Sequence, residues 1–271
     1  MYLKPIKMRY VILATMLALT LWGSVARAQE RQNIYQSVLG ESDQRIPEIS
    51  TMDIRRILAE RSAIVFDARP FREFAISHIP GARSLSAKPG VSRSMYISDV
   101  AEVGRVVGGD RSAAVVLYCN GPFCGKVNRL GKELLAAGHT NVQRYQLGIP
   151  VWRVLGGVTE IEGVGLRYVI ANDASAVLID AREAETYKSG TLASARNLPR
   201  SGVIDGKDVG EVRRAKDDGR LPTEDHNTRL IVVGRDAGEA RHVAEALVLE
   251  AFHNVAYFPG TFEEARAALQ P

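Results

Sequence analysis

The sequence predicts an α/β protein made of two tandem modules, each a mainly parallel sheet flanked by helices. The main observation is an internal repeat: residues 63–85 align without a gap to residues 176–198, with 7 identities among 23 positions. Chance would give roughly one or two identities over such a stretch. In addition, an unbroken apolar run at 113–118 suits a strand buried on both faces of a parallel sheet, and a helical pattern follows it.

The first 28 residues have the pattern of a secretory signal peptide. Basic residues open the chain, an uncharged and mostly apolar stretch runs from Val11 to Val25, and Ala26-Arg27-Ala28 supplies a small-x-small cleavage pattern. The apolar stretch is shorter than the roughly 20 residues that a membrane-spanning helix needs. We therefore expect cleavage after Ala28 and export, most simply to a periplasm, with no membrane contact of the mature chain.

The basic character of the chain belongs largely to this segment. Its formal net charge is +4, and the first 28 residues contain four basic residues and no acidic one. The remainder is formally neutral, and no basic stripe interleaved with aromatic residues is present. We expect no nucleic-acid partner.

The first module is expected at 48–156, after an N-terminal extension at 29–47. Ser50 or Thr51 can cap a helix that runs to about Glu60, and a strand follows at 63–66. The strand at 113–118 leads into a short loop and a helix that reaches about Ala137, and Gly138 ends that helix.

The second module is expected at 175–271, after a linker at 157–174. Glycines between Gly156 and Ala174 indicate a turn-rich connection. The strand at 176–180 repeats the first strand of module one. A second strand is expected at 229–233, and a helix from about Glu239 to Glu250.

Only two cysteines occur in the chain, Cys119 and Cys124, and they lie five positions apart. Cys119 directly follows a buried strand and precedes a tight loop and a helix, which is where α/β sheets bind their ligands. Loop amides and the helix dipole lower the pKa of a thiol there, so Cys119 is the candidate nucleophile. A disulfide between the two would close a small loop and would constrain the unfolded chain little, so stabilisation of the fold alone is a weak explanation for it.

Three motifs resemble the rhodanese family. Residues 67–85 are similar to its signature, with Asp67-Ala-Arg69 at a strand end and His78-Ile-Pro-Gly-Ala in a turn. Residues 118–125 resemble its active-site loop, in which the nucleophilic cysteine stands first, and residues 141–148 with Trp152 resemble the stretch that closes the domain. The resemblance is strong over 48–156 and weak over 161–271.

The resemblance implies a sulfurtransferase. Cys119 would accept a sulfane sulfur from thiosulfate or a mercapto acid, hold it as a persulfide, and pass it to a thiol or to cyanide. Amides directed at the sulfur would stabilise the anionic persulfide. No cofactor and no metal is expected; the spacings of His139, His226, His242 and His253 do not suggest a metal site.

The loop departs from the usual pattern because it contains no cation. Its members are Asn120, Gly121, Pro122, Phe123, Cys124 and Gly125. Many thiosulfate-using relatives carry Arg or Lys there, so affinity for a small dianion could be poor. Lys126 and Arg129 could compensate from the helix, or could equally face solvent.

Two interpretations of the role of Cys124 stay open. It could act as a resolving thiol that attacks a persulfide or sulfenic acid on Cys119 and forms a disulfide. Alternatively, it is a small buried apolar residue at a helix start.

We expect structural roles for the other candidate residues. Asp67 and Arg69 could support the loop or attract an anionic donor, but Asp180 and Arg182 repeat them in module two, which has no cysteine. A structural ion pair is therefore favoured. We expect His78 to hydrogen-bond within its turn rather than act as a base, and Trp152 to be a packing residue.

These observations predict an exported sulfurtransferase with Cys119 as persulfide carrier in module one. Module two would be inactive and would buttress the first, cover its mouth or bind a partner, such as a periplasmic protein. Two alternatives stay open: a non-enzymatic module that binds sulfur or a partner, and a thiol redox relay that uses Cys119 and Cys124.

Overall fold

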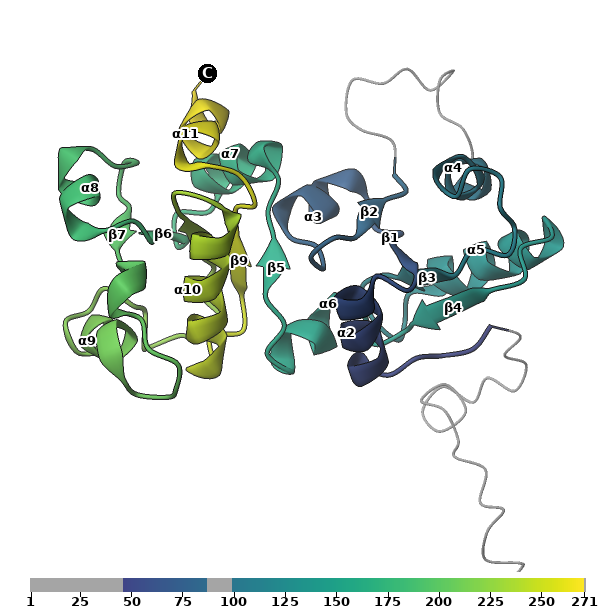
Figure 1. Cartoon of the computed structure of the whole chain (residues 1–271), viewed down its shortest axis with the longest axis horizontal. Helices are drawn as coiled ribbons and strands as arrows, with labels where there is room; N and C mark the ends of the chain where they lie inside the picture. Colours follow the sequence, from purple (N-terminus) through teal and green to yellow (C-terminus); the bar gives the residue numbers. More distant parts are fainter. Residues whose placement is uncertain (1–45, 87–98, 271) are drawn as a thin grey trace, which may run out of the picture. The chain divides into compact units, whose positions relative to one another are not determined.

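The computed structural model describes residues 46–86 and 99–270 (Figure 1). The predicted signal peptide, and all but the last two residues of the extension at 29–47, lie outside the described residues. All of the described residues belong to one compact unit. In the described part of the chain, no helix has the length and apolar character to cross a membrane.

The first module is built on a 4-stranded parallel sheet of order β2-β1-β3-β4. Its strands are β1 (Ile64–Asp67), β2 (Arg83–Ser84), β3 (Val115–Tyr118) and β4 (Val142–Tyr145). Its helices are α2 (Thr51–Glu60), α3 (Phe71–Ile76), α4 (Asp99–Val106), α5 (Gly125–Ala136) and α6 (Gly148–Val154). The predicted strands and helices of this module are confirmed, with shifts of one or two residues at their ends.

Local sequence explains where these helices begin and end. Ser50 caps α2, and Asp53 completes a capping box by accepting from the Ser50 backbone amide. Gly138 follows the C-terminus of α5 with a φ of +90°, a left-handed conformation that glycine adopts without steric cost. Both sequence predictions, the cap at residue 50 or 51 and the stop at residue 138, are confirmed.

Strand alternation places apolar side chains on both faces of the sheet. On one face, Leu117 and Cys119 pack with Val127 and Leu130 of α5. On the other face, Val116 and Tyr118 belong to a cluster that also contains residues of α2 and α6. Cys119 therefore directly follows the inner strand β3, with its side chain on the α5 side of the sheet, at the carboxyl edge of the sheet.

The second module repeats this plan on a 5-stranded parallel sheet of order β5-β9-β8-β6-β7. Its strands are β5 (Thr159–Glu160), β6 (Val177–Asp180), β7 (Arg196–Asn197), β8 (Leu230–Val233) and β9 (Val255–Tyr257). Its helices are α7 (Gly163–Asn172), α8 (Ala184–Ser189), the 3-10 helix η3 (Arg200–Gly202), α9 (Gly210–Asp217), α10 (Ala237–Leu249) and α11 (Phe262–Leu269).

The prediction of a turn-rich linker at 157–174 is wrong. This stretch contains β5, which pairs with β9, and the ten-residue helix α7. By the repeat offset α7 is the counterpart of α2, so the second module begins before residue 175. The glycines of this stretch do not all mark turns. Gly165 lies inside α7, where a Cβ would come within 1.9 Å of the Ala75 carbonyl oxygen. This glycine permits close packing and does not mark a turn.

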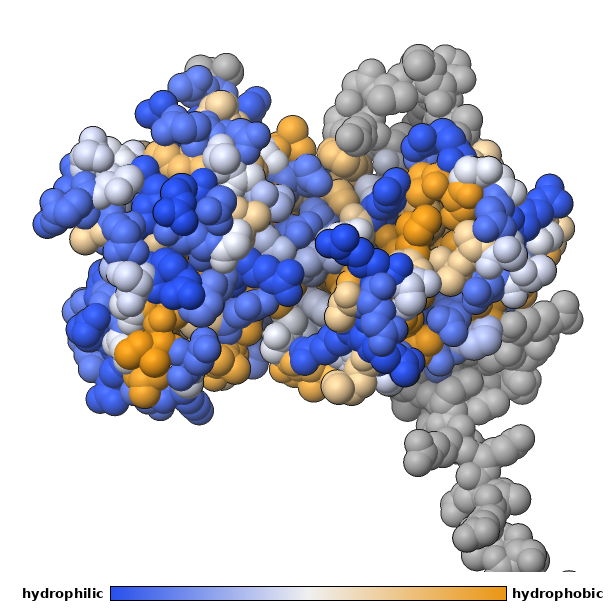
Figure 2. Space-filling model, viewed as in Figure 1, coloured by the Kyte–Doolittle hydropathy of each residue, from blue (hydrophilic) through white to orange (hydrophobic). Residues whose placement is uncertain are grey.

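Figure 2 shows apolar residues as scattered patches among polar ones on the face that it draws. Single exposed apolar residues are ordinary on protein surfaces. Phe123 is the most exposed of the large hydrophobic residues recorded in the described part, with 84% of its surface accessible, and it lies in the predicted active-site loop.

Candidate active site

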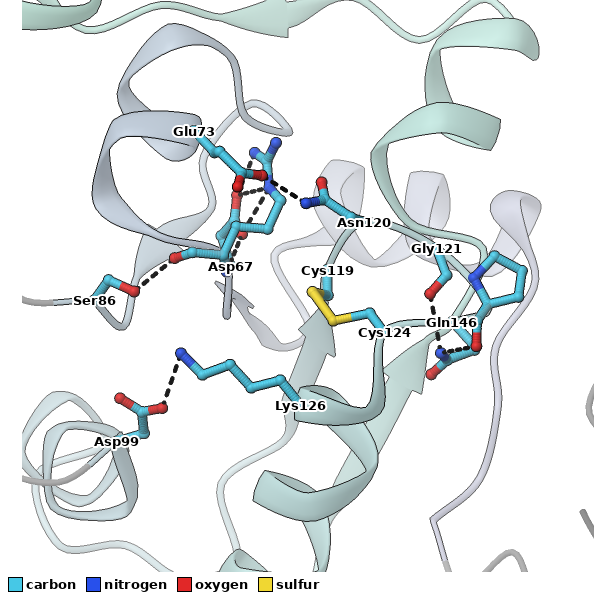
Figure 3. The surroundings of a disulfide bond; sticks show 12 residues. Asp67, Glu73, Ser86, Asp99, Cys119, Asn120, Gly121, Cys124, Lys126 and Gln146 are labelled. Atoms are coloured by element: carbon cyan, nitrogen blue, oxygen red, sulfur yellow. Dashed lines mark hydrogen bonds and ion pairs between the residues drawn. A yellow bond between two sulfur atoms is a disulfide. The ribbon is translucent and has the colours of Figure 1, made fainter.

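The structure places Cys119 and Cys124 together as a disulfide (Figure 3). Their Cα atoms lie 6.3 Å apart across the loop that connects β3 to α5. The two residues differ in exposure, because Cys119 is buried, with 6% of its surface exposed, whereas Cys124 is partly exposed. The predicted nucleophile is therefore the less exposed residue of the pair.

Cys124 occupies the N-cap of α5, a position that usually carries a capping side chain. No side-chain hydrogen bond caps this helix, and its first turn contains no acidic residue. The first amides of an α-helix have no acceptor within the helix, and the helix dipole adds positive potential at that end. A sulfur anion on either cysteine would thus meet an N-terminus that no carboxylate occupies.

The corresponding loop of module two is built differently. The strand register pairs Asp67 with Tyr118 and Asp180 with Val233, so Gly234 stands where module one has Cys119. The side chain of Asp236 caps α10 by accepting from the amide of Glu239, and the carboxylate of Glu239 accepts from the amide of Arg235. Carboxylates already occupy this helix N-terminus.

The closing segment lies directly against the loop. The Ile149 amide donates to the Cys119 carbonyl at 3.2 Å, and a Cβ on Gly148 would come within 2.2 Å of the same oxygen. The side-chain amide of Gln146 donates to the carbonyls of Gly121 and Pro122 at 3.2 and 3.0 Å, and Figure 3 shows the first of these bonds. The loop is therefore fixed by backbone contacts and by one buried side chain.

Gln146 and Glu73 are site residues that the sequence analysis did not single out. Glu73 accepts a hydrogen bond from the side chain of Asn120 at 2.6 Å. Gln146 falls within the closing motif 141–148, which could have drawn attention to it, whereas Glu73 had no signal beyond its place in the 67–85 signature.

The cations near the site are already paired. Lys126 forms an ion pair with Asp99 at 3.2 Å, and Arg69 forms one with Asp67 at 2.6 Å. Arg129 is well exposed and lies 3.7 Å from Glu133. Of the two possible helix cations, Lys126 lies beside the disulfide in Figure 3, and Arg129 faces solvent.

Asp67 and Arg69 form the structural pair that the sequence favoured. Arg69 donates to both carboxylate oxygens and to the Ser77 carbonyl, and both residues are buried. Burial lowers the pKa of Arg69, but the hydrogen bonds to Asp67 and the negative charges of Asp67 and Glu73 together raise it overall. Asp180 and Arg182 make the same pair at 2.7 Å.

Tyr118 links this ion pair to the strand that carries Cys119. Its hydroxyl accepts from the Ile79 amide at 3.1 Å and also hydrogen-bonds Asp67. Complete burial and the neighbouring Asp67 charge raise the pKa of Tyr118 far above its usual value. The phenol is therefore neutral and positions the strand end.

His78 and Trp152 have structural contacts. The His78 ring stacks on Phe74, its Nδ1 lies 3.0 Å from the Phe74 carbonyl, and its Nε2 lies 3.2 Å from the Glu160 carboxylate. The prediction of a hydrogen bond within the turn is wrong in its partner, because the ring bonds to Phe74 of the preceding helix α3 and contacts Glu160. Trp152 is buried and donates to the Val158 carbonyl at 2.8 Å.

A family model for the rhodanese-like domain matches residues 50–154 and 168–268, which covers both modules. The chain belongs to the rhodanese family. The predicted fold class and tandem organisation are thereby confirmed, and the family supports sulfur transfer in general.

Solved rhodanese-fold structures are similar to the chain at low identity. A thiosulfate sulfurtransferase from Pseudomonas aeruginosa is 19% identical with a TM-score of 0.35; the match covers 83% of this chain but only 43% of that one. A 3-mercaptopyruvate sulfurtransferase from Escherichia coli is 15% identical with a TM-score of 0.35, and the match covers 80% and 98% of the two chains. At such identities the likeness concerns the fold alone. No curated protein matches.

Proposed function

We propose that this rhodanese-family protein is an exported sulfurtransferase in which Cys119 carries the transferred sulfur as a persulfide. The observation that carries the proposal is the placement of Cys119 directly after the inner strand β3, beside the uncapped N-terminus of α5.

The first step would be attack by the Cys119 thiolate on the sulfane sulfur of the donor. The bond between that sulfur and the rest of the donor breaks, and its electron pair leaves with the donor remnant, as sulfite from thiosulfate. The N-terminus of α5 would stabilise the thiolate before the step and the anionic persulfide after it. A thiophilic acceptor, a thiol or cyanide, would then take the outer sulfur.

The paired cations bear on the choice of donor. The loop adds no charge, and both Lys126 and Arg69 already face carboxylates. Glu73, hydrogen-bonded to Asn120, adds negative charge nearby. We therefore propose that a singly charged donor such as mercaptopyruvate loads the site at lower concentration than the dianion thiosulfate does.

The test is loading of the reduced chain. The chain is first reduced, because the disulfide blocks Cys119, and is then freed of reductant under anaerobic conditions. It is incubated with thiosulfate or with mercaptopyruvate, and intact mass is measured on wild type, on Cys119→Ala and on Cys124→Ser. Sulfur that loads Cys124→Ser but not Cys119→Ala supports the proposal. Failure of both donors on every protein would refute it and favour a non-enzymatic binding module.

Export is proposed from the first 28 residues alone. The expected result is a secreted chain whose first residue is Gln29, determined by N-terminal sequencing after expression in a host with a periplasm. A chain that stays in the cytoplasm with residues 1–28 attached would refute export without affecting the sulfur chemistry.

A further inference from the structure

We infer that the Cys119–Cys124 disulfide is the product of a second chemical step, in which Cys124 resolves the Cys119 persulfide and releases sulfide. The inference rests on the proposed function, because it needs the persulfide. It assigns Cys124 a catalytic role, as the thiol within the same loop that resolves the persulfide on Cys119.

The identity of the bonded atoms supports this step. A thiol that attacks the outer sulfur of a persulfide only takes over the sulfane sulfur, whereas attack on the inner sulfur expels the outer one as sulfide. The structure holds the bond that the second route forms, between the sulfur atoms of Cys119 and Cys124. This bond lies in the β3–α5 loop, whose carbonyls also accept hydrogen bonds from Gln146 and Ile149.

Accessibility favours an internal attacker over an external one at this sulfur. Cys119 is 6% exposed, so the inner sulfur of its persulfide would be covered by the loop and by α5. Cys124 stands on the same loop and needs no entry path. An external thiol has access chiefly to the outer sulfur, which explains how transfer to acceptors and internal release can start from the same persulfide.

The position of Cys124 also supplies its reactivity. A thiol at a helix N-terminus has a lowered pKa, and the N-cap of α5 has no side-chain acceptor and no first-turn carboxylate to compete with a thiolate. The other reading of Cys124, a buried apolar residue at a helix start, does not account for its bond to the nucleophile.

The step balances with a dithiol as reductant. Cys124 thiolate attacks the inner sulfur, the Cys119–Cys124 bond forms, the bond to the outer sulfur breaks, and that sulfur leaves as hydrosulfide with the electron pair. The two cysteines lose two electrons and the sulfane sulfur gains them. A dithiol, small or on a protein, then attacks the more exposed Cys124, expels the Cys119 thiolate toward the α5 N-terminus, and closes its own disulfide.

A single-turnover experiment tests the inference. Reduced wild type and Cys124→Ser, freed of reductant under anaerobic conditions, receive a donor in excess. Intact mass is measured after acid quench, and released sulfide is trapped by alkylation. We expect wild type to lose the mass of two hydrogen atoms, to release one sulfide per chain and then to stop until dithiothreitol is added. Cys124→Ser should gain the mass of one sulfur atom and release no sulfide.

The outcomes separate the two proposals. If Cys124→Ser gains no sulfur, the persulfide itself is refuted, and the inference fails with it. If both proteins hold a persulfide and neither releases sulfide, the proposed function stands and the resolving role of Cys124 is overturned. A wild-type disulfide that forms equally without donor would overturn it too, because oxidation would then be independent of the persulfide.

Discussion

Replacing Gly148 by alanine tests how the closing segment supports the active-site loop. Gly148 has a φ of +63°, and an alanine Cβ would lie 2.2 Å from the Cys119 carbonyl oxygen and 2.5 Å from the Gly121 nitrogen. Contacts of a Cβ below 3.0 Å are essentially never seen, and both neighbours are backbone atoms, so the chain must separate by about 1 Å.

The expected effect has two parts. A left-handed backbone costs alanine about 1 kcal/mol relative to glycine. Forcing the loop apart adds roughly 1–3 kcal/mol, as overpacking does elsewhere. We therefore expect Gly148→Ala to lower the free energy of unfolding by about 2–4 kcal/mol. A 1 Å displacement of the strand end that carries Cys119 should slow sulfur loading by about 100-fold.

Gly156→Ala is the matched control. Gly156 has a φ of +79° just beyond α6, and a Cβ there would meet nothing within 4 Å. It should lose about 1 kcal/mol and load at the wild-type rate. Chemical denaturation measures stability, and the rate of mass gain after mixing with donor, with both glycine variants made in the Cys124→Ser background, measures loading. If Gly148→Ala matched Gly156→Ala in stability and in loading rate, the close approach of Gly148 to the loop would have no bearing on the site.

Three further predictions concern buried or partly buried charges. Asp67→Asn and Asp180→Asn each leave a buried arginine without its carboxylate, so each should cost about 3–5 kcal/mol in unfolding experiments, but only Asp67→Asn should slow sulfur loading. Burial raises the pKa of Glu160, but hydrogen bonds from His78 and Tyr257 lower it overall, so the charged carboxylate stabilises the fold above the usual glutamate pKa and this contribution is lost as pH falls through the lowered value. Glu160→Gln should therefore destabilise the fold at neutral pH and much less at pH about 3. Equal losses of stability at both pH values would refute this. Burial lowers the pKa of Arg153 to about 10, and no carboxylate pairs with it in the described structure. Arg153→Met should therefore raise the free energy of unfolding by about 1 kcal/mol at neutral pH. A lower free energy of unfolding would show that the hydrogen bond from Arg153 to Ser77 outweighs the desolvation cost.

The sequence predicted the elements whose cause is local or periodic. The apolar run before Cys119 became β3, the cap at Ser50 and the stop at Gly138 followed from side-chain and backbone chemistry, and the 113-residue repeat predicted the Asp67–Arg69 pair together with its copy. These features depend on residues close in sequence or on a comparison within the chain.

The rest depended on contacts between segments distant in sequence. The pairing of Glu73 with Asn120, of Lys126 with Asp99 and of Glu160 with His78 joins segments 27 to 82 positions apart, and no local pattern indicates such partners. The glycines after Gly156 were ambiguous for the same reason. Only the fold shows that Gly165 serves packing against Ala75 rather than a turn.

The helix N-termini of the two modules differ in a way that agrees with the predicted inactivity of module two. Gly234, the counterpart of Cys119, has no room for a side chain, because a Cβ there would lie 2.8 Å from the Ala240 nitrogen. Around it, Asp236 and Glu239 accept from amides that in α5 have no such side-chain acceptor. A cysteine placed at residue 234 would therefore face two carboxylates, which raise the pKa of a thiol. The two modules thus differ at the same place: carboxylates occupy the N-terminus of α10, whereas the N-terminus of α5 has no carboxylate and stands beside the two cysteines.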